Sequence, residues 1–173
     1  MFNYIFDLTW DIAHSQLLIN KKGVNMGLDM YLQGRLYHHG MKHDNDGKFT
    51  ERKREKVEGY EKTATEIELA YWRKHPNLHG YIVKTFNKGV DDCTPIDLSP
   101  DNLDQIADAI EDDNLPETTG FFFGESSWHE DEKEENIKIF KDASKWLRSK
   151  WEGENKYTNK QDYWASVQYQ ASW

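Results

Sequence analysis

The stretch 26–32, Met-Gly-Leu-Asp-Met-Tyr-Leu, alternates side chains in the manner of a half-buried β-strand. Leu28, Met30 and Leu32 share one face of that strand, and Asp29 and Tyr31 share the other. A strand of this kind needs partner strands and a layer that covers its apolar face. We therefore expect a domain with a mainly antiparallel sheet to begin here.

A second alternating run lies at the end of the sequence, in residues 163–172. Val167, Tyr169 and Ala171 alternate there with serine and glutamine side chains. The apolar set is expected on the buried side of the sheet. We predict that Val167, Tyr169 and Trp173 pack in the interior of the sheet layer.

Four helices are predicted between these strands. The first covers about 60–74, where ring and aliphatic side chains recur at helical steps: Tyr60, Ala64, Ile67 and Tyr71. The second has Pro76 in its first turn and stops at Gly89. The third begins at Ser99-Pro100, a capping hydroxyl followed by proline. The fourth follows a capping box of Ser127 and Glu130 and buries a single stripe of side chains: Ile137, Phe140, Ala143, Leu147 and Trp151.

The expected fold class is α+β, a small mainly antiparallel sheet covered by about four helices. Its strands come from four segments: 27–36, 93–98, 120–124 and 163–172. The length of 173 residues suits one domain, which we place at 26–173. Residues 1–25 are predicted to be a peripheral N-terminal extension, and residues 38–59 a long charged loop or hairpin.

The composition favours a folded domain and argues against several classes of protein, including generic nucleic-acid binders and membrane-spanning proteins. Aromatic residues make up 14% of the chain, and buried rings supply the apolar area that a core requires. The formal net charge is −9, which argues against generic nucleic-acid binding, because phosphate contacts need a surplus of cations. Cys93 is the only cysteine, so no internal disulfide can form. No apolar run reaches the roughly 20 residues of a membrane span, and we expect a cytoplasmic protein without a cofactor.

A candidate ligand site lies around the helix break at Pro76. The residues assigned to it are Trp72, Arg73, Lys74, His75 and His79, with Ser126 and Ser127 at the start of the last helix. Two cations beside a helix N-terminus can hold a phosphorylated or carboxylated ligand, on which the tryptophan would stack. The alternative is purely structural, with Trp72 in the core, Arg73 and Lys74 solvated, and His75 as a helix cap.

The other patterns in the sequence are weaker indications of a metal or phosphate site. His38, His39 and His43 have a spacing that zinc can use, but nothing nearby completes four ligands. Cys93 combined with a histidine at 75 or 79 is no stronger, so no metal is predicted. The glycines around 120–124 lack the phosphate-loop pattern GxxxxGK[ST], and no catalytic residues can be assigned.

The sequence resembles a family of small proteins common in phage and prophage genomes. Four stretches carry the resemblance: MGLDMYL at 26–32, YWRKHPNLHG at 71–80, LPETTGFFFGES at 115–126 and YQASW at 169–173. The resemblance spans residues 26–173 and implies no particular activity.

Three functions follow as hypotheses. The first is a non-enzymatic phage accessory protein that binds, blocks or sequesters a host component in an infected or lysogenic cell. Its partner would be a host protein or a small anionic ligand. The second is a small enzyme acting on a nucleotide-like or phosphorylated substrate at the site around Pro76. The third is a structural or virion-associated protein.

Overall fold

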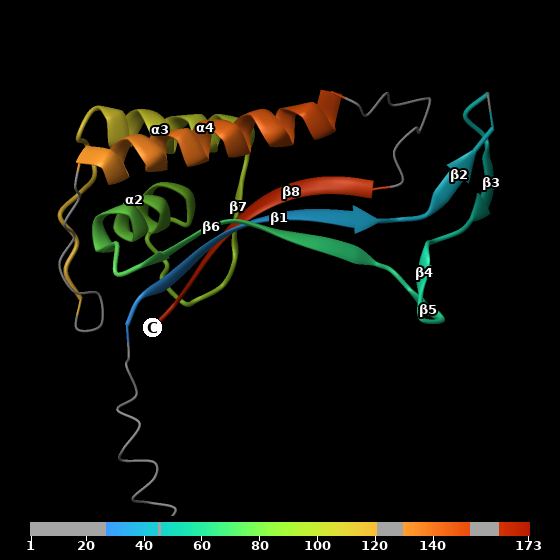
Figure 1. Ribbon diagram of the computed structural model, residues 1–173, viewed down its shortest axis with the longest axis horizontal. Helices are drawn as coiled ribbons and strands as arrows, with labels where there is room; N and C mark the ends of the chain where they lie inside the picture. Colours follow the sequence, from blue (N-terminus) through green and yellow to red (C-terminus); the bar gives the residue numbers. More distant parts are fainter. Residues whose placement is uncertain (1–26, 45, 121–129, 153–162) are drawn as a thin grey trace, which may run out of the picture.

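The computed structural model describes residues 27–44, 46–120, 130–152 and 163–173. Four strands form an antiparallel sheet in the order β6-β1-β8-β7. They are β1 (Asp29–His38), β6 (Ala64–Arg73), β7 (Ile96–Leu98) and β8 (Tyr163–Ser172). Within the described residues three helices, α2 (Pro76–Phe86), α3 (Pro100–Glu111) and α4 (Glu130–Glu152), lie on one side of that sheet (Figure 1). The predicted α+β class is confirmed.

Residues 29–32 of the predicted strand form the start of β1, which is the second strand of the sheet. It pairs with β6 on one side and with β8 on the other along its length. Leu28, Met30 and Leu32 are fully buried under the helices. Val167 and Tyr169 of β8 are buried beside them, as predicted, and Trp173 packs against this core while partly exposed.

The helix predicted at 60–74 is wrong, because this segment forms β5 (Tyr60–Glu61) and β6. Thr65 and Ile67 face the helices, whereas Glu66 and Glu68 lie on the other side of the sheet, opposite Arg35 and Gln33 of β1. The pairing then shifts by one residue, so that Ala70 lies opposite Leu32. This β-bulge at Leu69 spaces the helix-side residues Ile67 and Ala70 three positions apart, so the simple alternation of a strand is interrupted. Ala64 and Tyr71 of the predicted helical stripe lie on the opposite side of the sheet from Ile67.

Helices α2 and α3 begin where the sequence predicts, with Pro76 and Pro100 in their first turns. Ser99 and Asn102 exchange hydrogen bonds of 3.0 and 3.1 Å between side chain and backbone, which caps α3. On α4, Phe140, Ala143 and Leu147 are buried as expected, but Trp151 is 43% exposed. Its Nε1 donates to the Ala165 carbonyl of β8 at 3.1 Å, so the ring lies at the margin of the core with part of its surface in solvent. The predicted strand at 120–124 and the cap at Ser127 fall largely outside the described residues.

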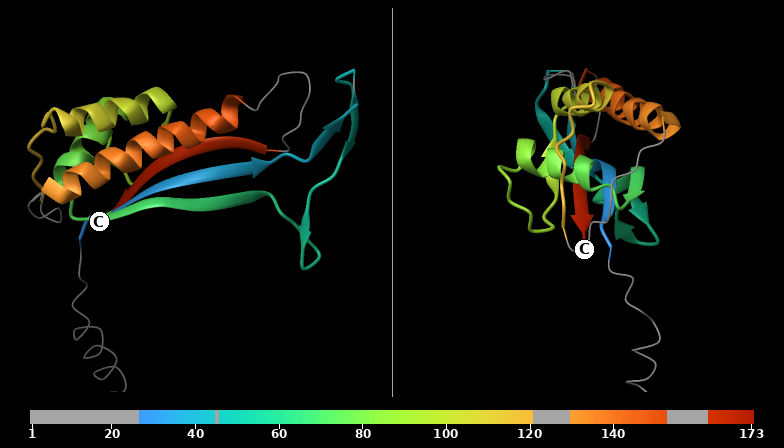
Figure 2. Two further views of the ribbon diagram at one scale, coloured as in Figure 1. Left: turned by 45° about the horizontal axis from the view of Figure 1, so that its top comes forward. Right: turned by 90° about the vertical axis from the view of Figure 1, so that its left-hand side faces the viewer.

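The charged region 38–59 forms hairpins at the end of the sheet away from the helices (Figure 2). β2 (Met41–His43) pairs with β3 (Phe49–Arg52), and β4 (Lys56–Val57) pairs with β5. Arg54 holds these pieces together, because its Nε donates to the His38 carbonyl at 2.8 Å and its Nη1 to Glu61 at 3.0 Å. The extension at 1–25 lies outside the described residues.

Candidate functional site

The turn between β6 and α2 positions the predicted ligand residues. His75 caps α2, and its Nδ1 accepts the Leu78 amide at 3.3 Å. Asn77 accepts the Thr118 amide at 2.9 Å, which brings the segment before residue 120 against the first turn of α2. The contact is close, since a Cβ on Gly80 would lie 2.0 Å from the Thr118 Oγ1. His75 and the segment at Thr118 thus take up much of the first turn that a ligand would use.

Trp72 belongs to the core, so the predicted stacking of its ring on a ligand is wrong. The ring lies parallel to Phe140 of α4, with centroids 5.5 Å apart and an interplanar angle of 9°. Its Nε1 donates to the Asn136 side chain, which is itself buried and donates to the Glu132 carbonyl at 2.7 Å. The ring joins β6 to α4, and the structural alternative holds for this residue.

His79 is also buried, within a chain of polar groups. Its Nδ1 lies 2.8 Å from the Tyr169 hydroxyl and its Nε2 lies 3.0 Å from Asp91. Burial raises the pKa of Tyr169 well above its usual value. The space beside these groups measures about 10 Å³, about the size of one water molecule. This arrangement satisfies buried polar atoms and leaves no room there for a substrate.

Among the described residues of the predicted site, Arg73 and Lys74 are exposed and His75 is half-buried. The two cations lie at the end of β6 beside Gly27, where an added Cβ would be 3.2 Å from the Lys74 Cε and 3.4 Å from an Arg73 nitrogen. Lys74 has a positive φ of 57°, and its amide donates to the Leu28 carbonyl at 2.8 Å. Ser126 and Ser127 lie outside the described residues, so the predicted meeting of these serines with the cations stays a prediction.

The histidines of the hairpin region each contact different partners. The His38 Nε2 lies 2.8 Å from the Thr65 hydroxyl, and the His39 Nδ1 accepts the Met41 amide at 3.0 Å. His43 packs edge-on against Phe49. In the part of the chain that the structure describes, no group of three or more His, Cys, Asp or Glu is placed to hold a metal ion.

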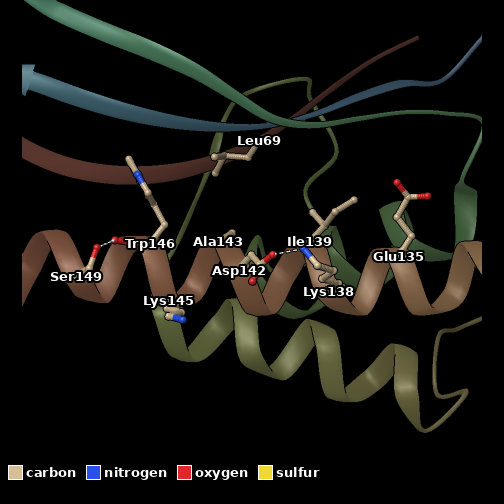
Figure 3. A pocket seen from close by; sticks show the side chains of 9 residues that line it. All are labelled: Leu69, Glu135, Lys138, Ile139, Asp142, Ala143, Lys145, Trp146 and Ser149. Atoms are coloured by element: carbon tan, nitrogen blue, oxygen red, sulfur yellow. Dashed lines mark hydrogen bonds and ion pairs between the residues drawn. The ribbon is translucent and has the colours of Figure 1, made fainter.

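A groove of about 670 Å³ lies between α4 and strand β6 (Figure 3). Four apolar side chains line it, namely Leu69, Ile139, Ala143 and Trp146, and its charged lining consists of Glu135, Lys138, Asp142 and Lys145. Gly34 of β1 makes room for Trp146, because an added Cβ would lie 2.9 Å from the ring. The sequence pattern pointed away from this surface, since Ile139 and Trp146 lie off the stripe predicted to be buried.

The side of the sheet opposite the helices is not covered by any described element (Figure 2). Two pairs of aromatic rings lie on it: Tyr31 with Tyr71 at 5.2 Å, and Tyr37 with Trp164 at 6.0 Å. Three of these four rings are large exposed side chains, at 46% for Tyr71, 41% for Tyr37 and 57% for Trp164. Sequence reasoning missed this surface because it placed Tyr71 on a helix.

The charges on this uncovered face are unequal. Register places six charged side chains on it: Asp29, Glu66, Glu68 and Asp97 are acidic, and Arg35 and Arg73 are basic. The Gln168 amide donates to Asp97 at 2.8 Å, and the Gln170 amide donates to the Cys93 carbonyl at 3.0 Å. The face is therefore aromatic at both ends and acidic overall, and it carries two glutamine amide groups that are already hydrogen-bonded.

No family model, curated protein or solved structure matches this chain. None of the described helices has the length and apolar character required to cross a membrane. Function therefore has to be inferred from the surfaces and contacts of the described residues.

Proposed function

We propose that this chain is a non-enzymatic binding module whose uncovered sheet face docks on a basic surface of another protein. The observation that carries the proposal is the pair of exposed aromatic clusters on that face. Tyrosine and tryptophan supply large, amphipathic contact area at low entropic cost, and they dominate the energetically important positions of protein interfaces. Exposed rings gathered on one face are typical of such interfaces.

The dimensions of the face suit a protein partner. Tyr31 and Tyr37 are six positions apart on β1, which corresponds to about 20 Å along a strand. The two clusters therefore lie at opposite ends of a patch with the width of a small protein interface. Gln168 lies between them and is held by Asp97, and Gln170 lies opposite Tyr31 and is held by the Cys93 carbonyl. Amide groups that are already oriented lose less entropy on binding.

The charge of the face favours one class of partner. Four carboxylates oppose two guanidinium groups on it, and the whole chain carries a net charge of −9. Such a potential attracts basic protein surfaces and repels nucleic acids. The resemblance to phage and prophage proteins suggests a host protein, which this module would block or sequester in the cytoplasm of the host cell.

The alternative of an enzyme for phosphorylated substrates has weaker support. Of the described residues assigned to that site, Trp72 and His79 are buried and His75 caps a helix. Arg73 and Lys74 remain exposed at the end of β6. An exposed cationic pair can contribute to binding an anion, but it supplies no acid, base or nucleophile for a reaction near neutral pH.

The test compares the wild type with a Tyr37→Ala/Trp164→Ala variant in capture from host lysate, quantified by mass spectrometry. Tyr60→Ala is the matched control, because Tyr60 is 80% exposed on the distal hairpin. We expect the double variant to keep its circular dichroism spectrum and to lose a specific basic protein at least tenfold, in line with aromatic hot spots. Equal capture by the folded double variant would remove the sheet face from consideration.

A further inference from the structure

The groove between α4 and β6 is an apolar surface that the described residues leave partly open (Figure 3). Leu69, Ile139 and Trp146 pack against the core on one side but are only partly buried. The lining on α4 runs from Glu135 to Ser149, a length of about 21 Å in a helix. A long apolar groove of this kind fits one amphipathic helix, which lays its apolar face into it.

A segment with this pattern precedes the first described residue of the same chain. Its apolar side chains recur at steps of three and four, which place them on one face of a helix: Phe2, Phe6, Trp10, Ala13 and Leu17. Polar side chains recur with the same steps and form a separate stripe: Asn3, Asp7, Asp11 and His14. In a helix the apolar stripe is about 22 Å long, close to the length of the groove.

The described chain starts close to one end of this groove. Gly27 lies beside Arg73 at the end of β6. The neighbouring Trp72 donates its Nε1 to Asn136 of α4, which follows Glu135 at the near end of the groove. Figure 1 likewise shows the starts of β1 and α4 at the same end of the sheet. A segment that precedes Gly27 can therefore enter the groove from the Glu135 end.

The connection between this segment and the sheet is long enough. Leu17 and Gly27 are ten positions apart, and an extended chain spans up to about 33 Å over that number of residues. The groove is closer than this, because Leu69 lies four positions from Arg73 on β6, about 13 Å along the strand. Residues 20–23, Asn-Lys-Lys-Gly, have a composition typical of a turn. A helix at 2–17 can therefore run back along α4, antiparallel to it.

The sizes of the facing side chains suit this direction. When residue 17 is placed level with Glu135, Phe6 falls level with Trp146, because each lies eleven positions from that starting point. The two rings can then form an aromatic pair. Trp10 falls beside Ala143, whose small side chain leaves room for an indole in the groove. Large and small side chains that alternate across a contact fill the space between two elements without voids.

We propose that residues 2–17 form an amphipathic helix that docks in the groove of the same chain, antiparallel to α4. The docked helix covers the apolar lining on the helix side of the sheet. This inference goes beyond the proposed function, which concerns the opposite, uncovered face. The core under α4 is formed by described residues, so release of the helix opens the groove without unfolding the sheet.

The experiment is paramagnetic relaxation enhancement in the full chain. A nitroxide is attached to Asn3→Cys in a Cys93→Ser background, because Cys93 is the only cysteine. Backbone amide signals are compared between the oxidised and the reduced label at Trp146 and Ser149, in the far half of the groove. Asp97 of β7, on the opposite edge of the sheet from β6, is the reference. Thermal melts establish that each variant is folded.

Two variants of the labelled chain test the apolar stripe. Phe6→Asp places a charge on it, and Ser15→Asp places the same charge on the opposite side of the predicted helix. We expect the amides of Trp146 and Ser149 to lose most of their signal in the labelled parent and in Ser15→Asp. They should recover in Phe6→Asp, and the Asp97 amide should keep its signal throughout.

Three outcomes would overturn the inference. The first is equal signal at Ser149 and Asp97 in the labelled parent, which would mean that the segment does not reach the groove. The second is the same signal loss in Phe6→Asp as in the parent, which would exclude docking through the apolar stripe. The third comes from a mixture of nitroxide-labelled chains with isotope-labelled chains that lack the nitroxide. Signal loss at Ser149 in that mixture would assign the groove to the segment of a second copy.

Discussion

The protonation of His75, which caps the N-terminus of α2, makes the stability of the fold depend on pH. Its imidazole is partly buried, and its Nδ1 accepts the Leu78 amide, which requires that this nitrogen carry no proton. Burial lowers the pKa of His75 from 6.5 to about 4, although the Glu132 carboxylate works in the opposite direction. In the unfolded chain the side chain titrates near its ordinary pKa of about 6.5.

The sign of the effect follows from proton binding. Between pH 6.5 and 4 the unfolded chain binds a proton at His75 that the folded chain does not. Falling pH therefore favours the unfolded state, and a contribution that is fully present above pH 6.5 is lost as the pH approaches 4. A difference of one between the pKa values of the folded and unfolded states corresponds to about 1.4 kcal/mol. The lowered pKa of His75 therefore reduces the free energy of unfolding by about 3 kcal/mol at most when the pH falls.

The perturbation is His75→Asn, which keeps an oxygen acceptor at the helix cap and removes the titrating group. Urea unfolding is measured from pH 7.5 to 4.5 for this variant and the wild type. We expect similar free energies of unfolding at pH 7.5 and a loss in the wild type that is about 2–3 kcal/mol larger at pH 4.5. His43→Asn in the distal hairpin controls for loss of a histidine elsewhere. Parallel curves for the wild type and His75→Asn would refute the reasoning.

Three further predictions concern stability. Tyr169→Phe removes the hydroxyl that lies 2.8 Å from the buried His79 Nδ1; urea unfolding should show a loss of about 1–3 kcal/mol, whereas no loss would mean that another group satisfies the histidine. Gly80→Ala should lower the melting temperature although alanine favours a helix by about 1 kcal/mol, because its Cβ would lie 2.0 Å from the Thr118 Oγ1; a higher melting temperature would contradict this contact. Deletion of residues 1–25 should leave cooperative thermal unfolding intact, whereas truncation after Tyr163 should abolish it, since β8 pairs with both β1 and β7.

Local signals in the sequence were sufficient for several elements. The alternation at 26–32 and 163–172 predicted β1 and β8, because every second residue is buried from Leu28 to Leu32 and from Ala165 to Ala171. Ser99-Pro100 predicted the start of α3, because a cap depends on a side chain and the amides of the next three residues. The apolar residues of α3 also recur at helical spacing, and Leu103, Ile106, Ala107 and Ile110 are all buried.

β6 could not be predicted in this way. Its alternation is interrupted at Leu69, and the pairing with β1 that makes it a strand joins residues about 40 positions apart, such as Met30 and Trp72. A propensity calculated from neighbouring residues does not contain that contact. The error carried over into the candidate site, because a helix at 60–74 placed Tyr71 and Trp72 in the wrong surroundings.

The sequence by itself determined where alternation and caps occur, because these depend on residues within three or four positions of one another. Only the tertiary structure decided which aromatic rings are buried, because burial depends on segments that meet from distant parts of the chain. Trp72 packs on Phe140, 68 residues later, so its ring cannot stack on a ligand. Trp164 instead packs beside Tyr37 on the uncovered face of the sheet. The candidate binding surface depends on that difference.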